Sequence, residues 1–309
     1  MPDLPNLANR DYERRINRAI DHVTGNLASS LKLDDVAKVA GFSPHHFHRI
    51  FRALMGETLA SFVKRVRLER AVSLLSHQPD RALTDIALAT GFSSSSDFSR
   101  CFRAQYGVPP RAFDVEVFRR HRRDKGLGSL EAPESGHRLT SLPKGENPDG
   151  FEVALRQLPA RRVAYVRAHR PYEGDGVKQA IARPLSWAED RGLADGQWLG
   201  YQWDDPDIVP LDKCRYDIGL EISSDVEVRD AVSTTRFPAM LVAEVPMAGG
   251  VELELRALDW IYTTWLPTSG FVPDHQPGFE AFDGRPFEHG ETHFELRIHI
   301  PVVPSSTPL

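Results

Sequence analysis

The chain has 309 residues, of which 41% are hydrophobic and 26% are charged, and its formal net charge is -5. It contains no apolar run of about 18 residues, which argues against a membrane-spanning helix, and its hydrophobic content argues against an intrinsically disordered chain. Two cysteines are too few for a disulfide framework and have no partners at metal-ligand spacing, so we expect the reducing environment of the cytoplasm. At roughly 100–200 residues per domain, this length predicts about two domains.

Charge and hydrophobic periodicity divide the chain into two halves. Residues 1–125 carry a net charge of +7 and the remainder -12, a division typical of a polyanion-binding module joined to an acidic one. Apolar residues recur at helical spacing over residues 12–118 and predict an all-α domain, which we place at residues 10–123. Residues 124–150 hold five glycines and three prolines and predict a linker. Short β-rich runs with two helical stretches then predict an α+β domain over residues 151–305.

The front half contains one unit twice. The segment from Leu33 to Ser43 returns fifty residues later, and the match continues at an offset of 51 beyond the serine. Each copy predicts a short helix, a turn at Gly-Phe-Ser and a second helix. Glycine supplies the positive φ that ends the first helix, and Ser43 or Ser93 caps the next one. The pattern predicts two helix-turn-helix units, at about residues 33–54 and 83–105.

The second helix of each unit has an apolar side and a polar side. In the first unit, the predicted apolar stripe is Phe47, Ile50, Phe51 and Leu54. The polar sides carry His45, His48, Arg49 and Arg52 in the first unit, and Ser96, Ser99, Arg100 and Arg103 in the second. In a DNA-reading helix Arg49 can donate two hydrogen bonds to guanine, worth roughly 1–3 kcal/mol against the wrong base. A solvated basic surface is the alternative explanation for a single helix of this kind. The polar side recurs at the same positions in the second copy, and this recurrence favours DNA reading. The shorter serines of the second unit predict more contacts to phosphates there.

The stretch from Thr58 to Ser76 predicts one continuous helix between the two units, with Thr58 as its N-cap. At 1.5 Å per residue it spans about 28 Å, close to the roughly 34 Å between successive major grooves on one face of DNA. One chain can therefore place both units on the same duplex, and we expect it to bind DNA as a monomer.

The front half resembles the DNA-binding domain of AraC/XylS-type transcription regulators. The resemblance rests on the doubled Ala-x-x-x-Gly-Phe-Ser motif, on Phe-His-Arg-Ile-Phe and Phe-Ser-Arg-Cys-Phe in the second helices, and on the closing Tyr-Gly-Val-Pro-Pro. It implies contacts to double-stranded DNA and an interaction with RNA polymerase. The residues that the resemblance and the polar sides indicate as DNA-contacting are His45, His48, Arg49, Arg52, Ser95, Ser96, Ser99, Arg100 and Arg103. The position of His45 often carries a larger aromatic residue in relatives, so the operator sequence does not carry over.

The back half is also duplicated, at an offset of 78. Each copy predicts a strand, a helix and two strands, so that the two copies form one pseudo-symmetric sheet covered by two helices. A cleft along the pseudo-two-fold axis is a common location for a small-molecule site. The matching segments are Val163-Ala164 with Leu241-Val242, Trp187 with Trp265, Gly200-Tyr201 with Gly278-Phe279, and Ile218-Gly219-Leu220 with Leu296-Arg297-Ile298.

This half resembles the GyrI-like effector-binding domain, and its place behind an AraC-type domain matches the Rob-like arrangement. The motifs that carry the resemblance are His169-Arg170-Pro171-Tyr172, Trp203-Asp204-Asp205-Pro206, Arg215-Tyr216-Asp217, Trp265-Leu266-Pro267-x-Ser269-Gly270 and Pro277-Gly278-Phe279-Glu280. The resemblance implies a ligand pocket at Glu280.

Glu280 is the main candidate for ligand recognition. Strand alternation places Glu280 and Phe282 on one face of the sheet, and the symmetry mate of Glu280 is the neutral Gln202. A carboxylate among aromatic residues is costly to desolvate without a cation or donor, so a flat cationic ligand fits such a site. The alternative is an ion pair with Arg285. The aromatic residues that we expect to form the walls of the pocket are Tyr172, Trp203 and Trp265, although core packing is the commoner role of a helical tryptophan.

These observations predict a multidomain transcription regulator, with an all-α domain of two helix-turn-helix motifs followed by an α+β domain of duplicated β-α-β-β units. Its partners are double-stranded DNA, a small cationic or amphipathic effector and RNA polymerase. We predict no catalytic residue, cofactor, metal or membrane contact. The alternatives from other classes are a GyrI-like hydrolase, with Glu280 as general base, and an effector-free protein-docking domain. Two groups of histidines are candidate metal sites, and neither is favoured. The histidines at residues 45–48 lie on the DNA-recognition side of their helix, and Gly290 opposes the helix that residues 289–293 would need to bind zinc.

Overall fold

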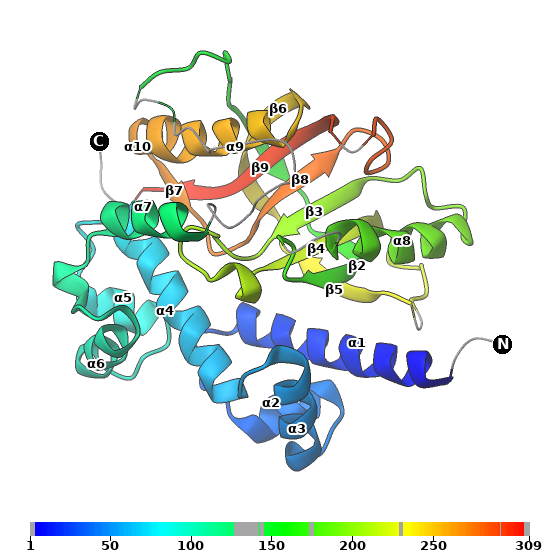
Figure 1. The fold of residues 1–309 in the computed structure, drawn as a ribbon, viewed down its shortest axis with the longest axis horizontal. Coiled ribbons are helices and arrows are strands. Elements are labelled where there is room, and N and C mark those ends of the chain that lie inside the picture. Colours follow the sequence, from blue (N-terminus) through cyan, green and yellow to red (C-terminus); the bar gives the residue numbers. More distant parts are fainter. Residues whose placement is uncertain are drawn as a thin grey trace. The chain divides into compact units, whose positions relative to one another are not determined.

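The computed structural model describes residues 4–126, 142, 145–172, 176–228, 231–290 and 292–305. Figure 1 shows its helices and strands. The chain forms two compact units, Met1–Arg120 with Arg229–Ser233, and His121–Val228 with Thr234–Leu309. Over the described residues, no helix combines the length and the apolar character that crossing a membrane requires.

The first unit is helical, as the periodicity predicted. Its elements in chain order are α1 (Leu4–Gly25), α2 (Leu33–Ala40), α3 (Pro44–Met55), α4 (Leu59–His77), α5 (Leu83–Ala89), α6 (Ser95–Tyr106), a 3-10 turn (Pro110–Ala112) and α7 (Val115–Gly126). The division between the two units falls within α7. The helix predicted from Thr58 is α4, and the Thr58 side chain accepts a hydrogen bond from the Ser61 backbone N–H, as an N-cap does.

The turns of the two helix-turn-helix units differ in one detail. Gly41 and Gly91 both adopt a positive φ, of 71° and 85°, at the end of the first helix. Ser43 caps α3 by accepting from the His46 N–H at 3.4 Å. The cap of α6 is Ser94, which accepts from the Asp97 N–H at 3.1 Å, so the prediction of Ser93 was wrong by one position. The reason is the one-residue insertion that changes the repeat offset from 50 to 51 immediately after the serine.

The apolar side of α3 follows a row four residues apart. Phe47 and Phe51 are fully buried, and Met55 packs against the same core. Leu54, which we expected in the stripe, is 38% exposed, so that part of the prediction was wrong. Met55 continues the i, i+4 row of Phe47 and Phe51, which rotates Leu54 away from the core.

The second unit is an α+β domain built on one sheet, and its two copies of strand, helix, strand and strand confirm the predicted duplication. The described strands are β1 (Ala154–Leu158), β2 (Arg161–His169), β3 (Trp198–Gln202), β4 (Arg215–Ile222), β5 (Ser233–Phe237), β6 (Met240–Gly249), β7 (Phe271–Pro273), β8 (Gly278–Phe282) and β9 (Phe294–Pro304). The helices are α8 (Gly176–Glu189), α9 (Val251–Trp260), a π-helical turn (Ile261–Trp265) and α10 (Leu266–Ser269), with a 3-10 turn at Leu211–Lys213. The strand order is β1-β6-β9-β8-β3-β4-β2-β5, and β7 pairs with β9.

The pseudo-two-fold axis passes between β3 and β8. These strands pair antiparallel with Tyr201 opposite Phe279, and these two residues are also mates at the offset of 78. The axis is perpendicular to the sheet, so both helices cover the same face. In the next strands the offset slips: Asp217 opposes Tyr201 and His299 opposes Phe279, which makes Asp217 and His299 equivalent at an offset of 82. The predicted match of Ile218 with Leu296 was therefore wrong, because loops of different length separate the central and outer strands.

The two faces of the sheet carry different clusters. The face under α9 holds Leu296, Ile298 and Ile300, packed with Trp260 and Ile261 from the helical side. The other face holds a cluster around Tyr165, Tyr201, Phe237 and Phe279. Only two residues separate β1 from β2, and two separate β5 from β6. Connections this short bring the two ends of the strand order together, so the sheet bends around the second cluster.

Most of the predicted linker, residues 127–141 with 143 and 144, lies outside the described residues. The part nearest the second domain is held by the π turn and α9. The backbone N–H of Gly145 donates to Thr264 Oγ1 at 3.2 Å, and Asp149 accepts two hydrogen bonds of 2.8 Å from Arg256.

Candidate functional site

The polar side of α3 is open to solvent. His45, Arg49 and Arg52 are exposed and His48 is partly exposed, while Phe47 and Phe51 face the core. The helix carries two arginines and three histidines and no acidic residue. The four side chains predicted to contact DNA in this unit therefore form one accessible polar surface, to which Arg49 and Arg52 give a positive charge.

The polar side of α6 is also open but less basic. Ser96, Arg100 and Arg103 are exposed, and Ser95 and Ser99 are partly exposed. The sequence interpretation overlooked Asp97, which accepts a hydrogen bond of 2.6 Å from the Arg100 guanidinium. A carboxylate in the first turn opposes phosphates and occupies one of the two arginines, so α6 presents a weaker cationic surface than α3.

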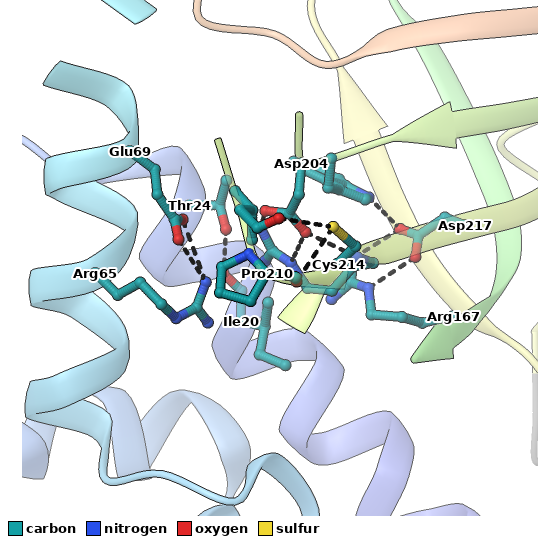
Figure 2. A network of polar contacts seen from close by, with 12 residues as sticks. Ile20, Thr24, Arg65, Glu69, Arg167, Asp204, Pro210, Cys214 and Asp217 are labelled. Carbon is teal, nitrogen blue, oxygen red and sulfur yellow. Dashed lines mark hydrogen bonds and ion pairs between the residues drawn. The ribbon is translucent and has the colours of Figure 1, made fainter. Parts of the chain in front are cut away.

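The helix α4 between the two units carries a shielded ion-pair network. Arg65 Nη2 lies 2.7 Å from Glu57 and Nη1 lies 3.0 Å from Glu69, and Figure 2 shows the contact between Arg65 and Glu69. All three side chains are only 11–14% exposed. Because both ends of the guanidinium are held, the network stiffens α4 and ties it to the loop after α3.

In the α+β domain, Glu280 lies at the centre of the sheet on the face covered by the helices. It is 6% exposed. Its Oε2 accepts a hydrogen bond of 2.5 Å from the Tyr216 hydroxyl, and its Oε1 accepts one of 2.6 Å from the Gln202 amide. Gly200 makes room for this arrangement, because a Cβ at that position would overlap the Tyr216 hydroxyl and lie 2.6 Å from Glu280 Oε2. Gln202, the symmetry mate of Glu280, thus reaches across the axis to it.

A second carboxylate joins Glu280, and the sequence interpretation missed it. Glu254 comes from α9, and its Oε1 accepts from the Gln202 amide at 3.4 Å. Burial raises the pKa of Glu280, although the hydrogen bonds that it receives oppose the rise. Burial, followed by the charge of Glu280, raises the pKa of Glu254 well above its ordinary value. Two carboxyl groups this close favour a shared proton when no cation is present.

Arginine does not neutralise this site. Arg285, the expected alternative partner of Glu280, instead contacts Asp195 at 2.6 Å and Glu189 at 3.4 Å, so the alternative was wrong. Among the described residues, no lysine or arginine contacts Glu280. The site is a buried acidic centre with hydroxyl and amide donors, which suits a positively charged ligand.

The structure brings one of the predicted aromatic walls near Glu280. Burial raises the pKa of the Tyr172 hydroxyl, and the charges of Cys214, Asp205 and then Glu280 add to the rise, so Tyr172 lies within electrostatic range of the acidic centre. Phe282 shares the face of Glu280 and packs in the cluster under α9. Trp265 stacks on Phe271 and lies eleven residues beyond Glu254 along a continuous helical stretch, a separation of about 16 Å.

Trp203 lies on the opposite face of the sheet. Its indole N–H donates to Asp217 Oδ2 at 2.6 Å, and Arg167 forms a bidentate pair with the same carboxylate at 2.7 and 2.6 Å. Figure 2 shows Asp217 and Arg167 close to a second bidentate pair, in which Asp204 accepts from Arg215. Strand alternation from Gln202 already predicts that Trp203 lies on the face opposite to Glu280, because neighbouring residues of a strand point to opposite faces.

No group of three or more His, Cys, Asp or Glu residues that could hold a metal ion occurs in the described part of the chain. His289 and His293 both approach Glu295, at 3.9 and 3.8 Å, in an exposed loop.

Two helix-turn-helix units with exposed polar helix sides, followed by a duplicated sheet domain with a buried acidic centre, define a two-domain protein of the helix-turn-helix class. The family described as a helix-turn-helix domain matches residues 36–115, and the family described as a GyrI-like small molecule binding domain matches residues 151–303. The chain belongs to the AraC-type family of transcription regulators, with a GyrI-like second domain.

Individual relatives match parts of the chain. It is 37% identical over 83 residues, 27% of this chain and 67% of the relative, to "Probable transcription factor PqrA" of Proteus vulgaris. It is 31% identical over 144 residues, 47% of each chain, to "Uncharacterized HTH-type transcriptional regulator YbfP" of Bacillus subtilis. Among solved structures, an AraC-type regulator from Chromobacterium violaceum is 31% identical, with a TM-score of 0.30 over 31% of this chain and 86% of that one. The chain spans about half or less of the length of the first curated relatives that it matches.

Proposed function

We propose that the protein is a one-component transcription regulator that binds double-stranded DNA through α3 and α6 and a small cationic or amphipathic effector at Glu280. The observation that carries the proposal is that α3 and α6 each present a solvent-exposed polar side and are joined by the 19-residue helix α4, which acts as a strut. At about 28 Å, this strut suits two recognition helices in successive major grooves, so one molecule occupies one operator.

The proposed division of labour follows the surfaces. The domain of residues 10–123 reads DNA, residues 124–150 link, and residues 151–305 sense the effector. In the first unit, His45, His48, Arg49 and Arg52 contact base edges and phosphates. In the second, Ser95, Ser96, Ser99, Arg100 and Arg103 contact mainly phosphates, because serine reaches less far and Asp97 holds Arg100.

The proposed effector site consists of Glu280 with Tyr172 and Phe282, extended by Glu254, Gln202 and Tyr216. Trp203 and Trp265 are proposed to support the domain rather than to contact the ligand, given their positions. Effector binding shifts the population of states that bind DNA or RNA polymerase. A protein with these two ligands acts in the cytoplasm, where chromosomal DNA and polymerase meet.

DNA binding is tested by selecting duplexes from a random pool with the whole chain and measuring affinity in gel shifts. Selected duplexes should share two half-sites one helical turn apart, and affinity should fall steeply with salt because phosphate contacts release counterions. Recovery of no preferred sequence would contradict the proposal.

Effector binding is tested by thermal shift of the whole chain with flat cationic dyes and with neutral dyes of similar size. Cationic dyes should stabilise the wild type more than neutral dyes do, and Glu280→Gln should reduce the difference between the two dye classes. The matched control is Glu152→Gln, which removes an exposed carboxylate and should change neither response.

One observation supports a second function. A buried carboxyl group with a raised pKa beside a tyrosine hydroxyl is also suited to general acid–base catalysis. Recovery of the stabilising dye intact after long incubation supports the sensor, whereas hydrolysis of an ester-bearing dye that is lost in Glu280→Gln would support a hydrolase.

A further inference from the structure

An arginine lies where the strut α4 passes from one helix-turn-helix unit to the other. The hydrophobic core of the first helix-turn-helix unit, which contains α2 and α3, includes Leu59, Phe62, Val63 and Val66 of α4. The first and second units named below are the two helix-turn-helix units. Later turns of α4 pack against α5 of the second unit. Arg67 comes directly after Val66 and so stands at the junction.

Arg67 binds the backbone of the first unit. Its Nε donates to the carbonyl oxygen of Leu27 at 3.0 Å, and its Nη2 donates to the carbonyl oxygen of Ser29 at 2.8 Å. Both residues lie in the segment between α1 and α2, and the Leu27 side chain packs against the first core. A planar guanidinium that donates to two fixed carbonyls sets orientation as well as distance.

The second unit meets the same arginine. Gly91, the turn glycine of the second unit, has a φ of +85°, and a Cβ there would lie 2.8 Å from Arg67 Nε and overlap the Leu27 carbonyl oxygen. Backbone from the first unit, the strut and backbone from the second unit therefore touch at one point. Only glycine permits this approach.

The first unit offers a matched comparison. Gly41, the equivalent turn glycine, also has a positive φ, and a Cβ there would lie 3.3 Å from Arg15 Nη2. Arg15 comes from α1 and stacks over the Phe42 ring at 4.4 Å, within the first unit. Both turn glycines thus lie beside an arginine of a preceding helix, but Arg67 joins the two helix-turn-helix units, whereas Arg15 contacts Asp11 and Phe42 within the first one.

We propose that Arg67, the Leu27 carbonyl and Gly91 form the joint that fixes the register of α3 relative to α6, and with it the spacing between half-sites that the protein accepts. The inference rests on the proposed DNA-binding function. Arg67 lies ten residues, or about 15 Å, from the end of α4 at His77, so a rotation of about 15° at the joint moves that end by about 4 Å, more than the roughly 3.4 Å rise of one base pair. Arg67 is thus a positioning residue for DNA reading, and it need not touch DNA.

The test compares a duplex selected by the wild type with variants that carry one or two base pairs inserted between its half-sites. We expect the wild type to lose at least tenfold in affinity on a single insertion. Arg67→Ala should reduce that ratio to below about threefold, and Arg67→Lys should restore part of it, because an ammonium reaches one carbonyl but does not clamp two. Arg15→Ala should keep the wild-type ratio, whatever its effect on overall affinity.

Gly91→Ala provides a second perturbation of the joint and should relax the ratio as Arg67→Ala does, with thermal unfolding confirming that each variant is folded. Wild-type spacing ratios in both Arg67→Ala and folded Gly91→Ala would overturn the inference while leaving the DNA-binding function intact. Failure of the wild type to select any duplex would instead overturn the proposed function, and the inference with it.

Discussion

Replacing Glu280 by glutamine should weaken the binding of a monocationic ligand and leave a neutral ligand of the same size unaffected. At 4 Å and an effective dielectric constant of about 20, one carboxylate attracts a unit positive charge by about 4 kcal/mol. Glu254 stays beside the site and retains about half of that attraction, so the single variant loses about 2 kcal/mol, or about 30-fold in affinity. The double variant with Glu254→Gln should lose about 1000-fold.

The same pair makes binding dependent on pH. Both pKa values are raised, so over the pH range below them the empty site carries a proton, which a cation displaces. Affinity for a cationic dye should therefore rise with pH, by up to about tenfold per unit when one proton leaves. Folding stability has the opposite dependence. Stability from the protonated pair is fully present below the ordinary value of 4.5 and is lost as pH rises through the raised pKa values.

Titration calorimetry in buffers of different ionisation enthalpy measures the protons released, and dye fluorescence measures affinity from pH 5 to pH 8. Both substitutions by glutamine should flatten the pH dependence of affinity and of thermal stability. Equal affinity of wild type and Glu280→Gln for a cationic dye, at every pH, would refute the reasoning.

Three further predictions concern single positions. Arg49→Ala should reduce discrimination at one base pair by about 1–3 kcal/mol in gel shifts of systematically substituted operators, and unchanged preference at every position would exclude a base contact. Gly200→Ala should destabilise the second domain by about 1–3 kcal/mol in denaturant unfolding, because the new methyl group overlaps the Tyr216 hydroxyl; a wild-type midpoint would show that the strand relaxes freely. Asp217→Ala should cost about 3–5 kcal/mol, because it leaves Arg167, which is 0% exposed, without its carboxylate, whereas a cost below about 1 kcal/mol would mean that the arginine gains solvent.

Sequence predicted the helical unit well because its signals are local. A helix repeats every 3.6 residues, so the buried positions of α3 and the Thr58 cap of α4 follow from neighbours within one or two turns. The errors were local too. The cap of α6 is Ser94 and not Ser93, because an insertion moved the start of the helix by one residue. The core contact at the end of α3 is Met55 and not Leu54, because Met55 lies four residues after Phe51 in the same buried row.

The acidic centre of the second domain was predicted only in part. The offset of 78 made Gln202 the symmetry mate of Glu280, and in the structure the Gln202 amide donates a hydrogen bond to Glu280. Glu254 was missed because nothing near it in the chain marks it: it lies on a helix 26 residues before Glu280 and reaches it only when α9 folds back over the sheet. Trp203 could have been excluded from this face by alternation alone.

The sequence by itself determined the two-domain order, the doubled helix-turn-helix, the exposed cationic side of α3 and the duplicated strand pattern, since each is written in spacings of a few residues or in direct repetition. Only the tertiary structure decided that Glu254 joins Glu280, that Arg285 pairs elsewhere, and that Arg67 meets both Leu27 and Gly91. These contacts join residues that are 24 to 96 positions apart in the chain. Their distances depend on how whole helices and strands pack, and that is fixed by the burial of the complete core rather than by any local pattern.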